Sequence, residues 1–376
     1  MNNRSTITLN ATALKNNIAH YKKACKGRLL GVVIKSNAYG HGLIEIGKLL
    51  QLNNHVDWFF VASLSEAILL RKQGITKPIL AMYHLDDDPK LLSLFDISIM
   101  VTEMQTVQQL SEIGKQSIRP IKIHVKIDTG LSRFGFLASE ALSVALTIKQ
   151  LAGVVLEGIY SHLAEAAQQD SQFTVQQIEL FNHVLQQLAY AGITIPFRHI
   201  ANTAATTAYE LGDTNLVRVG LGIYGLWPSV ANKENTKKKF PEFELESVLS
   251  WHSKIEFIRE LKVGDYVGYD RTFKAEKNSK IAIVPVGYFD GYDRRFSNNA
   301  LVMINNSFVP VVGRIAMTTM MVDITTIDAK IGDQVTLIGS QELINPSYLA
   351  IIMQSYNPRE LLTRIGEGIP RVISSS

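Results

Sequence analysis

Short apolar runs alternate with amphipathic stretches over the first two thirds of the chain. Eight β-branched runs lie between residues 29 and 220, and the intervals between them repeat apolar residues at helical spacing. Parallel strands need crossover connections, which are usually helices, and eight such units of this length are typical of a closed barrel. The pattern therefore predicts a (β/α)8 barrel of the TIM type, with an opening helix over residues 9–24.

The pattern changes after the basic stretch KENTKKK at residues 233–239, which we interpret as a linker. Short strand-like runs then follow one another closely, joined by turn pairs rather than by helices. Only residues 347–356 carry a helical pattern in this part. We therefore expect a barrel domain at 1–240 and a mainly antiparallel β domain at 241–376.

Composition narrows the class of protein. The 376 residues are 46% hydrophobic and 19% charged, enough for a large core. The net charge is 38 − 34 = +4 without a basic patch, which gives no reason to expect a nucleic-acid partner. No apolar run approaches the roughly 20 residues that cross a bilayer. The single cysteine, Cys25, excludes an intramolecular disulfide. The first ten residues lack an apolar leader, and these features together predict a cytoplasmic protein without a membrane partner.

Polar residues follow the predicted strands at the barrel end where sites of this fold lie. They cluster after five of the eight runs. The candidates are Lys35, Tyr39, Lys126, Arg133, His162, His199, Asn202, Thr203, Arg218, Gly220 and Leu221.

Two of these candidates lie beside or inside apolar strands. Lys35 follows GVVI, where its amine could be shielded for bonding to a carbonyl, although a lysine at a strand end often extends into solvent. Arg218 lies inside LVRVG and needs a buried acceptor, which could equally be a structural ion pair. Gly220 and Gly222 could expose backbone N–H groups to a phosphate, or simply form a turn. His162 could tune such a site or be a core histidine. The tyrosines at 269 and 288 have no role that the residues alone require.

The segment VVIKSNAYGHG closely resembles the cofactor-lysine motif of bacterial alanine racemases, pyridoxal-phosphate enzymes built from a barrel and a β domain. Further blocks resemble the family in family order over the whole chain. They are HVKIDTGLSRFGF (124–136), YSHLAEA (160–166), RHIANTAATT (198–207), VRVGLGIYGLWPS (217–229), DYVGYDRTF (265–273), VPVGYFDGYDRRF (284–296), VGRIAMTTMMVDIT (312–325) and RELLTRIGEGIPRVI (359–373).

The resemblance implies a homodimeric racemase that interconverts L- and D-alanine for peptidoglycan by a two-base mechanism. Lys35 would carry pyridoxal 5'-phosphate and serve one face of the substrate. Tyr269 of the partner subunit would serve the other face, so that the active sites are shared. Arg218 would bind the pyridine nitrogen, and His162 would link Arg218 to the catalytic tyrosine.

The resemblance also assigns roles to further positions. Arg133 would contact the cofactor's phenolic oxygen and the substrate, and Lys126 matches a lysine that is often carbamylated. The backbone N–H of Met317 would meet the substrate carboxylate. The remaining cofactor-binding positions are Tyr39, Asn202, Thr203, Gly220, Leu221, Tyr224 and Arg359, and the entry-corridor positions are Tyr288, Arg294 and Arg314.

Three departures from the family pattern concern the substrate. Thr318 stands where aspartate or asparagine is usual, Ala167 replaces an acidic residue, and Arg359 replaces a tyrosine that helps to hold the phosphate. A serine or broad-specificity racemase is therefore the alternative. A non-catalytic pyridoxal-phosphate carrier would lack the β domain, and a decarboxylase would lack the VGYD and VGYFDGY blocks.

Overall fold

A computed structural model describes residues 4–168 and 170–374. The chain divides into two compact units, a barrel unit and a β unit. The barrel unit is Lys15–Ser36 and Ile46–Leu245, and the β unit is the described part of Met1–Leu14, Asn37–Glu45 and Glu246–Ser376.

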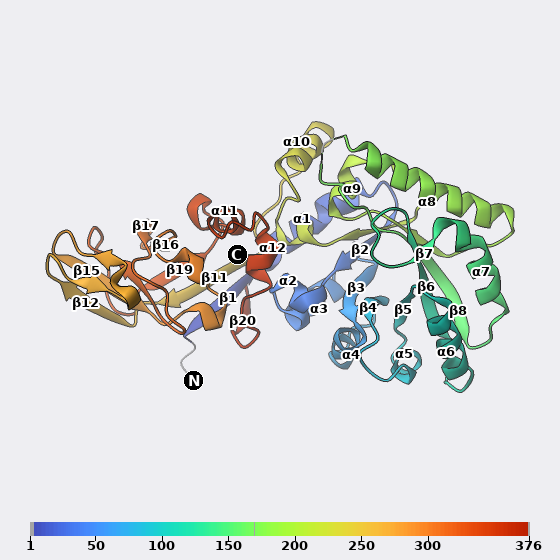
Figure 1. Cartoon of the computed structure of the whole chain (residues 1–376), viewed down its shortest axis with the longest axis horizontal. Helices are drawn as coiled ribbons and strands as arrows, with labels where there is room; N and C mark the ends of the chain where they lie inside the picture. Colours follow the sequence, from blue (N-terminus) through green and yellow to red (C-terminus); the bar gives the residue numbers. More distant parts are fainter. Residues whose placement is uncertain (1–3, 169, 375–376) are drawn as a thin grey trace. The chain divides into compact units, whose positions relative to one another are not determined.

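Eight parallel strands form the barrel unit, in the hydrogen-bonded order β10-β2-β3-β4-β5-β6-β8-β9. Figure 1 labels six of them, from β2 to β6 and β8. The ring is nearly closed, because the Arg218 N–H at β10 donates to the Ala201 carbonyl just after β9 at 3.1 Å. The predicted (β/α)8 barrel is thus confirmed. The strands are β2 (Leu29–Val33), β3 (Trp58–Ser63), β4 (Ile79–His84), β5 (Ser98–Val101), β6 (Ile121–Asp128), β8 (Val154–Tyr160), β9 (Phe197–His199) and β10 (Leu216–Val219); the two-residue β7 (Phe136–Leu137) also pairs with β6.

Amphipathic helices connect these strands. In the longest, α8, the buried residues Ile178, Phe181, Leu185 and Leu188 recur at three- and four-residue spacing, so one face packs inward. The Ser171 hydroxyl caps its first turn by accepting the Thr174 N–H. Besides the single turn α2 (Lys35–Tyr39), the helices before residue 210 are α1 (Ala11–Ala24), α3 (Leu43–Gln51), α4 (Leu64–Lys72), α5 (Lys90–Leu94), α6 (Met104–Lys115), α7 (Ala141–Gln150), α8 (Gln172–Tyr190) and α9 (Thr203–Ala208).

The basic stretch that we interpreted as a linker is instead a helix, α10 (Val230–Lys239). Ser229 caps its start by accepting the Asn232 N–H at 3.0 Å, and the buried Thr236 hydroxyl bonds Thr207 Oγ1 at 2.7 Å. Three lysines fill the last turn, where positive charge favours a helix. We predicted a linker because the stretch is dense in charge, but its residues form a capped helix.

The opening helix is preceded by a strand that we did not predict from the sequence. β1 (Ser5–Asn10) pairs antiparallel with β11 and parallel with β20, so it belongs to the β unit rather than to the barrel. Its apolar residues Ile7 and Leu9 are buried and alternate with threonines. This division differs from the expected single boundary at residue 240, because the chain starts in one unit, leaves it and returns.

The β unit contains a six-stranded sheet in the order β17-β16-β19-β11-β1-β20, a three-stranded sheet β12-β15-β18 and the pair β13-β14. All pairs except β1 with β20 are antiparallel, which confirms the predicted character. The remaining elements are β11 (Leu249–Lys254), β12 (Phe257–Leu261), β13 (Tyr266–Val267), β14 (Phe273–Lys274), β15 (Ser279–Val284), β16 (Leu301–Ile304), β17 (Ser307–Pro310), β18 (Met320–Asp323), β19 (Gln334–Ile338), β20 (Arg371–Ser374), α11 (Pro346–Ile352) and α12 (Pro358–Leu362).

Across both units, none of the helices among the described residues is long and apolar enough to span a membrane.

Candidate active site

Lys35 begins α2 (Lys35–Tyr39), a single turn whose residues 36–39 all have φ between 51° and 55°. L-residues seldom adopt this left-handed conformation, which costs about 1–2 kcal/mol per residue. Local hydrogen bonds hold the turn: the Ser36 N–H donates to Glu66 Oε1 at 2.6 Å, and Asn37 Oδ1 accepts the Leu43 N–H at 2.8 Å. Strain maintained in this way is typical of functional sites.

The amine of Lys35 lies over an aromatic ring that the sequence analysis missed. Lys35 Nζ is 4.7 Å from the ring centroid of Tyr83 on β4, and Arg133 Nη2 donates to the Tyr83 hydroxyl at 3.2 Å. Burial favours the neutral phenol, but the positive charges of Lys35 and Arg133 outweigh it and lower the pKa of Tyr83. Because Tyr83 follows the apolar run of β4, the strand-end rule could have found it.

A second cation pair lies over Tyr160 at the end of β8. Lys126 Nζ is 4.9 Å and the Arg218 guanidinium carbon 5.2 Å from the Tyr160 ring centroid, and both cations are almost fully buried. Burial, reinforced by the charges of Arg218 and Arg133, holds the pKa of Lys126 well below its usual value. Burial also lowers the pKa of Arg218 to about 10.

Neutral acceptors bind the two Nη groups of Arg218. Its Nη1 donates to His199 Nδ1 at 2.7 Å, and its Nη2 donates to the Ser161 carbonyl at 2.8 Å and to His162 Nδ1 at 3.2 Å. Burial and the charge of Arg218 hold the pKa values of both histidines well below the usual range. His162 and His199 are therefore neutral acceptors at physiological pH.

None of the four site cations, Lys35, Lys126, Arg133 and Arg218, takes part in an ion pair between described residues. Four cations at one end of the barrel without a paired carboxylate favour an anionic ligand. A cofactor with a phosphate and a phenolic oxygen fits this donor set.

Three of the predicted phosphate-binding positions come just after the strands β9 and β10: Thr203 begins α9, and Gly220 and Leu221 follow β10 directly. The Gly220 N–H donates to Thr203 Oγ1 at 3.0 Å, and Leu221 begins a short 3₁₀ turn (Leu221–Tyr224). The Asn202 side chain caps α9. Tyr224 donates its hydroxyl to a carbonyl of β2 at 3.0 Å, so its observed contact is structural.

The other predicted residues lie in the β unit. Tyr269 is 67% exposed and begins a short turn, and the next residue, Asp270, pairs with Arg314 at 2.5 Å. Met317 is also exposed. Arg359 donates its Nε–H to Asn357 Oδ1 at 2.8 Å. Tyr39 belongs to this unit as well.

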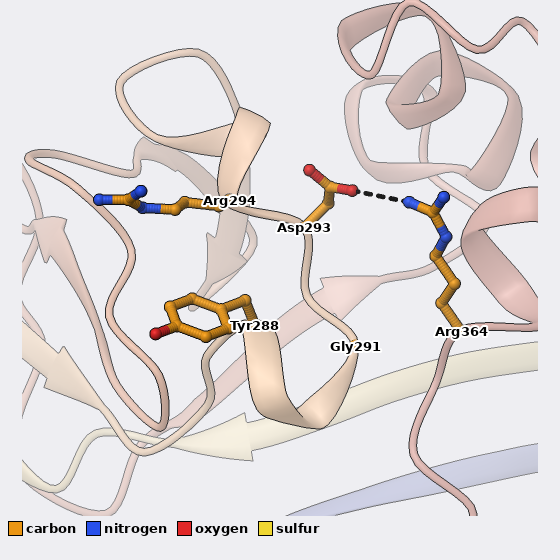
Figure 2. A pocket seen from close by; sticks show the side chains of 5 residues that line it. All are labelled: Tyr288, Gly291, Asp293, Arg294 and Arg364. Atoms are coloured by element: carbon orange, nitrogen blue, oxygen red, sulfur yellow. Dashed lines mark hydrogen bonds and ion pairs between the residues drawn. The ribbon is translucent and has the colours of Figure 1, made fainter.

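Two corridor candidates line a cavity of about 540 Å³ within the β unit. Figure 2 shows Tyr288 and Arg294 extending to one side, whereas Asp293 and Arg364 point toward each other. Asp293 accepts from Arg364 at 3.2 Å. The structure thus groups the predicted residues into a barrel set and a β-unit set.

The described residues contain no group of three or more His, Cys, Asp and Glu side chains that could hold a metal ion.

Comparison with known proteins gives a consistent result. Residues 9–228 match the family model of the alanine racemase N-terminal domain, and residues 248–373 match that of the C-terminal domain. An alanine racemase of Clostridium tetani is 37% identical over 362 residues, which cover 95% of this chain and 92% of the relative.

Solved structures agree with these matches. An alanine racemase of Clostridium difficile 630 is 30% identical with a TM-score of 0.92, covering 100% of this chain and 96% of that one. A structure of the Bartonella henselae alanine racemase with covalently bound pyridoxal phosphate shares the fold, with a TM-score of 0.83, 24% identity and 99% coverage of both chains.

Proposed function

The chain belongs to the alanine racemase family, and from this premise we propose that it interconverts L-alanine and D-alanine with pyridoxal 5'-phosphate as its cofactor. The observation that carries the proposal is the group of four cations without ion pairs around Lys35 and Arg218. A paired lysine or arginine would be explained by stability alone. These cations lack that explanation and sit at the barrel end where this fold places its sites.

In this proposal, residues of the barrel set would bind each polar part of the cofactor. Thr203, Gly220 and Leu221 would hold the phosphate, Arg133 would face the phenolic oxygen, and Arg218 would face the ring nitrogen. When bound, the cofactor supplies a ring system that spreads the negative charge left at the α-carbon once its proton is removed. Arg218 keeps its own proton at neutral pH, because even its lowered pKa of about 10 lies well above 7.

Racemisation needs a proton acceptor on one face of the α-carbon and a donor on the other. The amine of Lys35 would serve one face. The phenol of Tyr269 would serve the opposite face, supplied by the partner subunit of a homodimer. The support is that Tyr269 is largely exposed on its own chain and therefore accessible to another subunit.

Further residues would adjust this site. Burial and neighbouring cations hold the pKa of Lys126 well below its usual value, which increases the fraction of the amine that is neutral. The neutral amine would add carbon dioxide and release a proton to solvent, which leaves an anionic carbamate. A carbamate there would lie beside Arg218, which shares the Tyr160 ring with Lys126. The Met317 N–H would meet the substrate carboxylate, and Tyr288, Arg294 and Arg314 would line the entry.

The substrate could also be serine or a range of amino acids. This alternative depends on Arg359, because its exposed guanidinium stands where the resemblance expects a phenol. Alanine remains the first choice, and D-alanine production for peptidoglycan follows from it.

The test combines turnover with chemical trapping. Purified protein should racemise L-alanine faster than other members of an L-amino-acid panel. Borohydride should fix the cofactor on Lys35, as read by peptide mapping. Lys35→Ala should abolish both signals, whereas the exposed Lys115→Ala should change neither. A label on another lysine, or no racemisation of any amino acid, would contradict the proposal.

A further inference from the structure

Four side chains form an unbroken hydrogen-bonded chain through the interior of the barrel unit. Arg218 Nη1 bonds His199 Nδ1 at 2.7 Å, and His199 Nε2 bonds His124 Nδ1 at 3.0 Å. His124 Nε2 then bonds Glu157 Oε2 at 3.1 Å. Both histidines are completely buried, whereas the Glu157 side chain is 13% exposed, so only the terminal carboxylate reaches solvent. This hydrogen-bonded chain links the carboxylate of Glu157 on β8 to Arg218 in the proposed cofactor site.

The direction of each hydrogen bond follows from the first donor. A guanidinium can only donate, so His199 Nδ1 must carry no proton. The proton of neutral His199 therefore sits on Nε2 and donates to His124 Nδ1. That nitrogen is bare in turn, and the His124 proton sits on Nε2 and donates to Glu157. The protons all point away from Arg218.

Glu157 is the group that fixes this direction. An ionised carboxylate only accepts, which holds the His124 proton on Nε2. Burial opposes ionisation, but hydrogen bonds from His124 and Ser98 and the nearby charge of Lys122 lower the pKa of Glu157 overall. With a donor in its place, both histidines could reverse, and the His199 Nδ1–H would then face the Arg218 N–H. Two opposed donors would displace the guanidinium.

The remaining contacts of Arg218 show which of its N–H donors is free to bind a ligand. Nη2 donates to the carbonyls of Ser161 and Ile200 and to His162. Among the described residues, no acceptor meets its Nε–H. That donor is left for a ligand, and its direction depends on how the two Nη groups are held.

We propose that Glu157, His124 and His199 are positioning residues, a one-way hydrogen-bonded chain that orients Arg218 and supplies the counter-charge that it lacks in direct contact. The role toward the cofactor's ring nitrogen rests on the proposed function. The proton arrangement itself does not.

The first test uses the unmodified full chain. Nitrogen-15 NMR of protein labelled at histidine distinguishes the two neutral ring forms from each other and from the imidazolium. His124 and His199, identified by loss of their signals in His→Asn variants, should both be neutral with the proton on Nε2. A proton on His199 Nδ1, or a charged ring at either position at pH 7, would overturn the proposal even if the protein racemises alanine.

The second test changes the terminal carboxylate. Glu157→Gln keeps the shape but can donate, so the ring forms should become mixed. The holoprotein should lose cofactor on dialysis roughly tenfold faster, comparable to the loss of an outer hydrogen-bond partner at a metal site. Asp57→Asn is the matched control, because Asp57 pairs with Lys22 elsewhere in the barrel unit. It should change neither measurement.

A third test asks whether Glu157 affects cofactor retention through Arg218. In an Arg218→Leu background, Glu157→Gln should not accelerate cofactor loss further, because the chain then has nothing to orient. A full additional tenfold loss would show a general structural role and overturn the proposal. Should Glu157→Gln fail to fold, Ser98→Ala removes one donor to Glu157 and raises its pKa, so the ring forms should become mixed at a higher pH than in the wild type. An identical pH dependence of the ring forms in both proteins would count against the hydrogen-bonded chain.

Discussion

Positive side chains gather in two regions of the molecule, and their partners differ. At the end of the barrel, Lys126 and Arg218 lie over an aromatic ring, and Arg218 bonds neutral acceptors. In the β unit, Arg364 contacts Asp293 at 3.2 Å and Glu360 at 2.6 Å, and Arg295 contacts Asp293 at 2.8 Å.

The pKa values shift in opposite directions in the two regions. Burial lowers the pKa of Arg218 to about 10, whereas the hydrogen bond to Asp293 raises the pKa of Arg295. The same residue type thus stabilises a fold where carboxylates neutralise it. At the barrel end no carboxylate of the described residues pairs with Lys126 or Arg218, which leaves their charge available to an anionic ligand.

The largest expected effect comes from removing the two proposed bases. Lys35→Ala and Tyr269→Phe should each lower racemisation by about 10²–10⁴-fold or more, because each removes one proton-transfer group. Mixing the two inactive homodimers under conditions of subunit exchange should restore up to about a quarter of wild-type activity, since half the dimers are mixed and each has one intact site.

The control for this experiment is Lys35→Ala mixed with the Lys35→Ala, Tyr269→Phe double variant, which contains no intact site in any combination. Activity should be regained only in the first mixture. Proven exchange without recovery would show that Lys35 and Tyr269 do not act across subunits.

Strand-end residues of the barrel were predictable because the apolar runs are continuous and the fold fixes where they end. Lys35, Lys126 and Arg218 were found in this way. Tyr83 also follows an apolar run and was missed only because we treated a tyrosine there as a core residue. The left-handed turn after Lys35 could not be predicted, because three of its four residues carry no sequence signal for positive φ.

The β unit shows another limit of sequence reasoning. The pairing of β1 with β11 and β20 joins segments hundreds of residues apart. The alternation of apolar and polar residues identifies β1 as a strand, but it does not indicate which strands β1 pairs with. The chain through His124 and Glu157 was also missed, because both residues lie within strands that otherwise look like ordinary core.

The next prediction concerns stability and the buried Lys126. Its folded pKa is depressed below the unfolded value near 10.4, so the unfolded chain binds more protons between the two pKa values. The free energy of unfolding of the wild type relative to Lys126→Met should therefore rise as pH increases through this window. Urea unfolding at several pH values from 7 to 10 measures it.

Asp293→Asn provides the contrast from the paired region. The folded pKa of Asp293 is lowered, with the Arg295 hydrogen bond as the main cause, so its stabilisation is present at neutral pH and lost as pH falls through that pKa. This variant should flatten the acid side of the stability profile and leave the alkaline side unchanged. For Lys126, parallel stability profiles of Lys126→Met and the wild type above pH 7 would contradict the lowered pKa of the buried amine.

Tyr83→Phe should have a smaller effect, because it keeps the ring beside Lys35 and removes only the hydroxyl. The lost contact with Arg133 is worth about 0.5–1.5 kcal/mol, or roughly 2–13-fold in kcat/KM. Tyr190→Phe, at a 92% exposed tyrosine, is the matched control and should behave as wild type. Equal kinetics for the two variants would remove Tyr83 from the site.

The smallest expected effect belongs to Arg359, which combines features of both regions. It lies in the β unit, yet its guanidinium contacts the neutral Asn357 and joins no ion pair between described residues. Like Arg218, an arginine without a paired carboxylate is available for a ligand, and a phosphate dianion is the strongest attractor that the proposed function offers. Arg359→Tyr should therefore speed cofactor loss several-fold. The alanine-to-serine preference should change by less than about tenfold, or 1.4 kcal/mol of differential transition-state binding.

Arg259→Tyr, at an exposed strand position, controls for the added aromatic ring. A larger shift in substrate preference with unchanged cofactor retention would place Arg359 against the substrate side chain and favour the broad-specificity alternative.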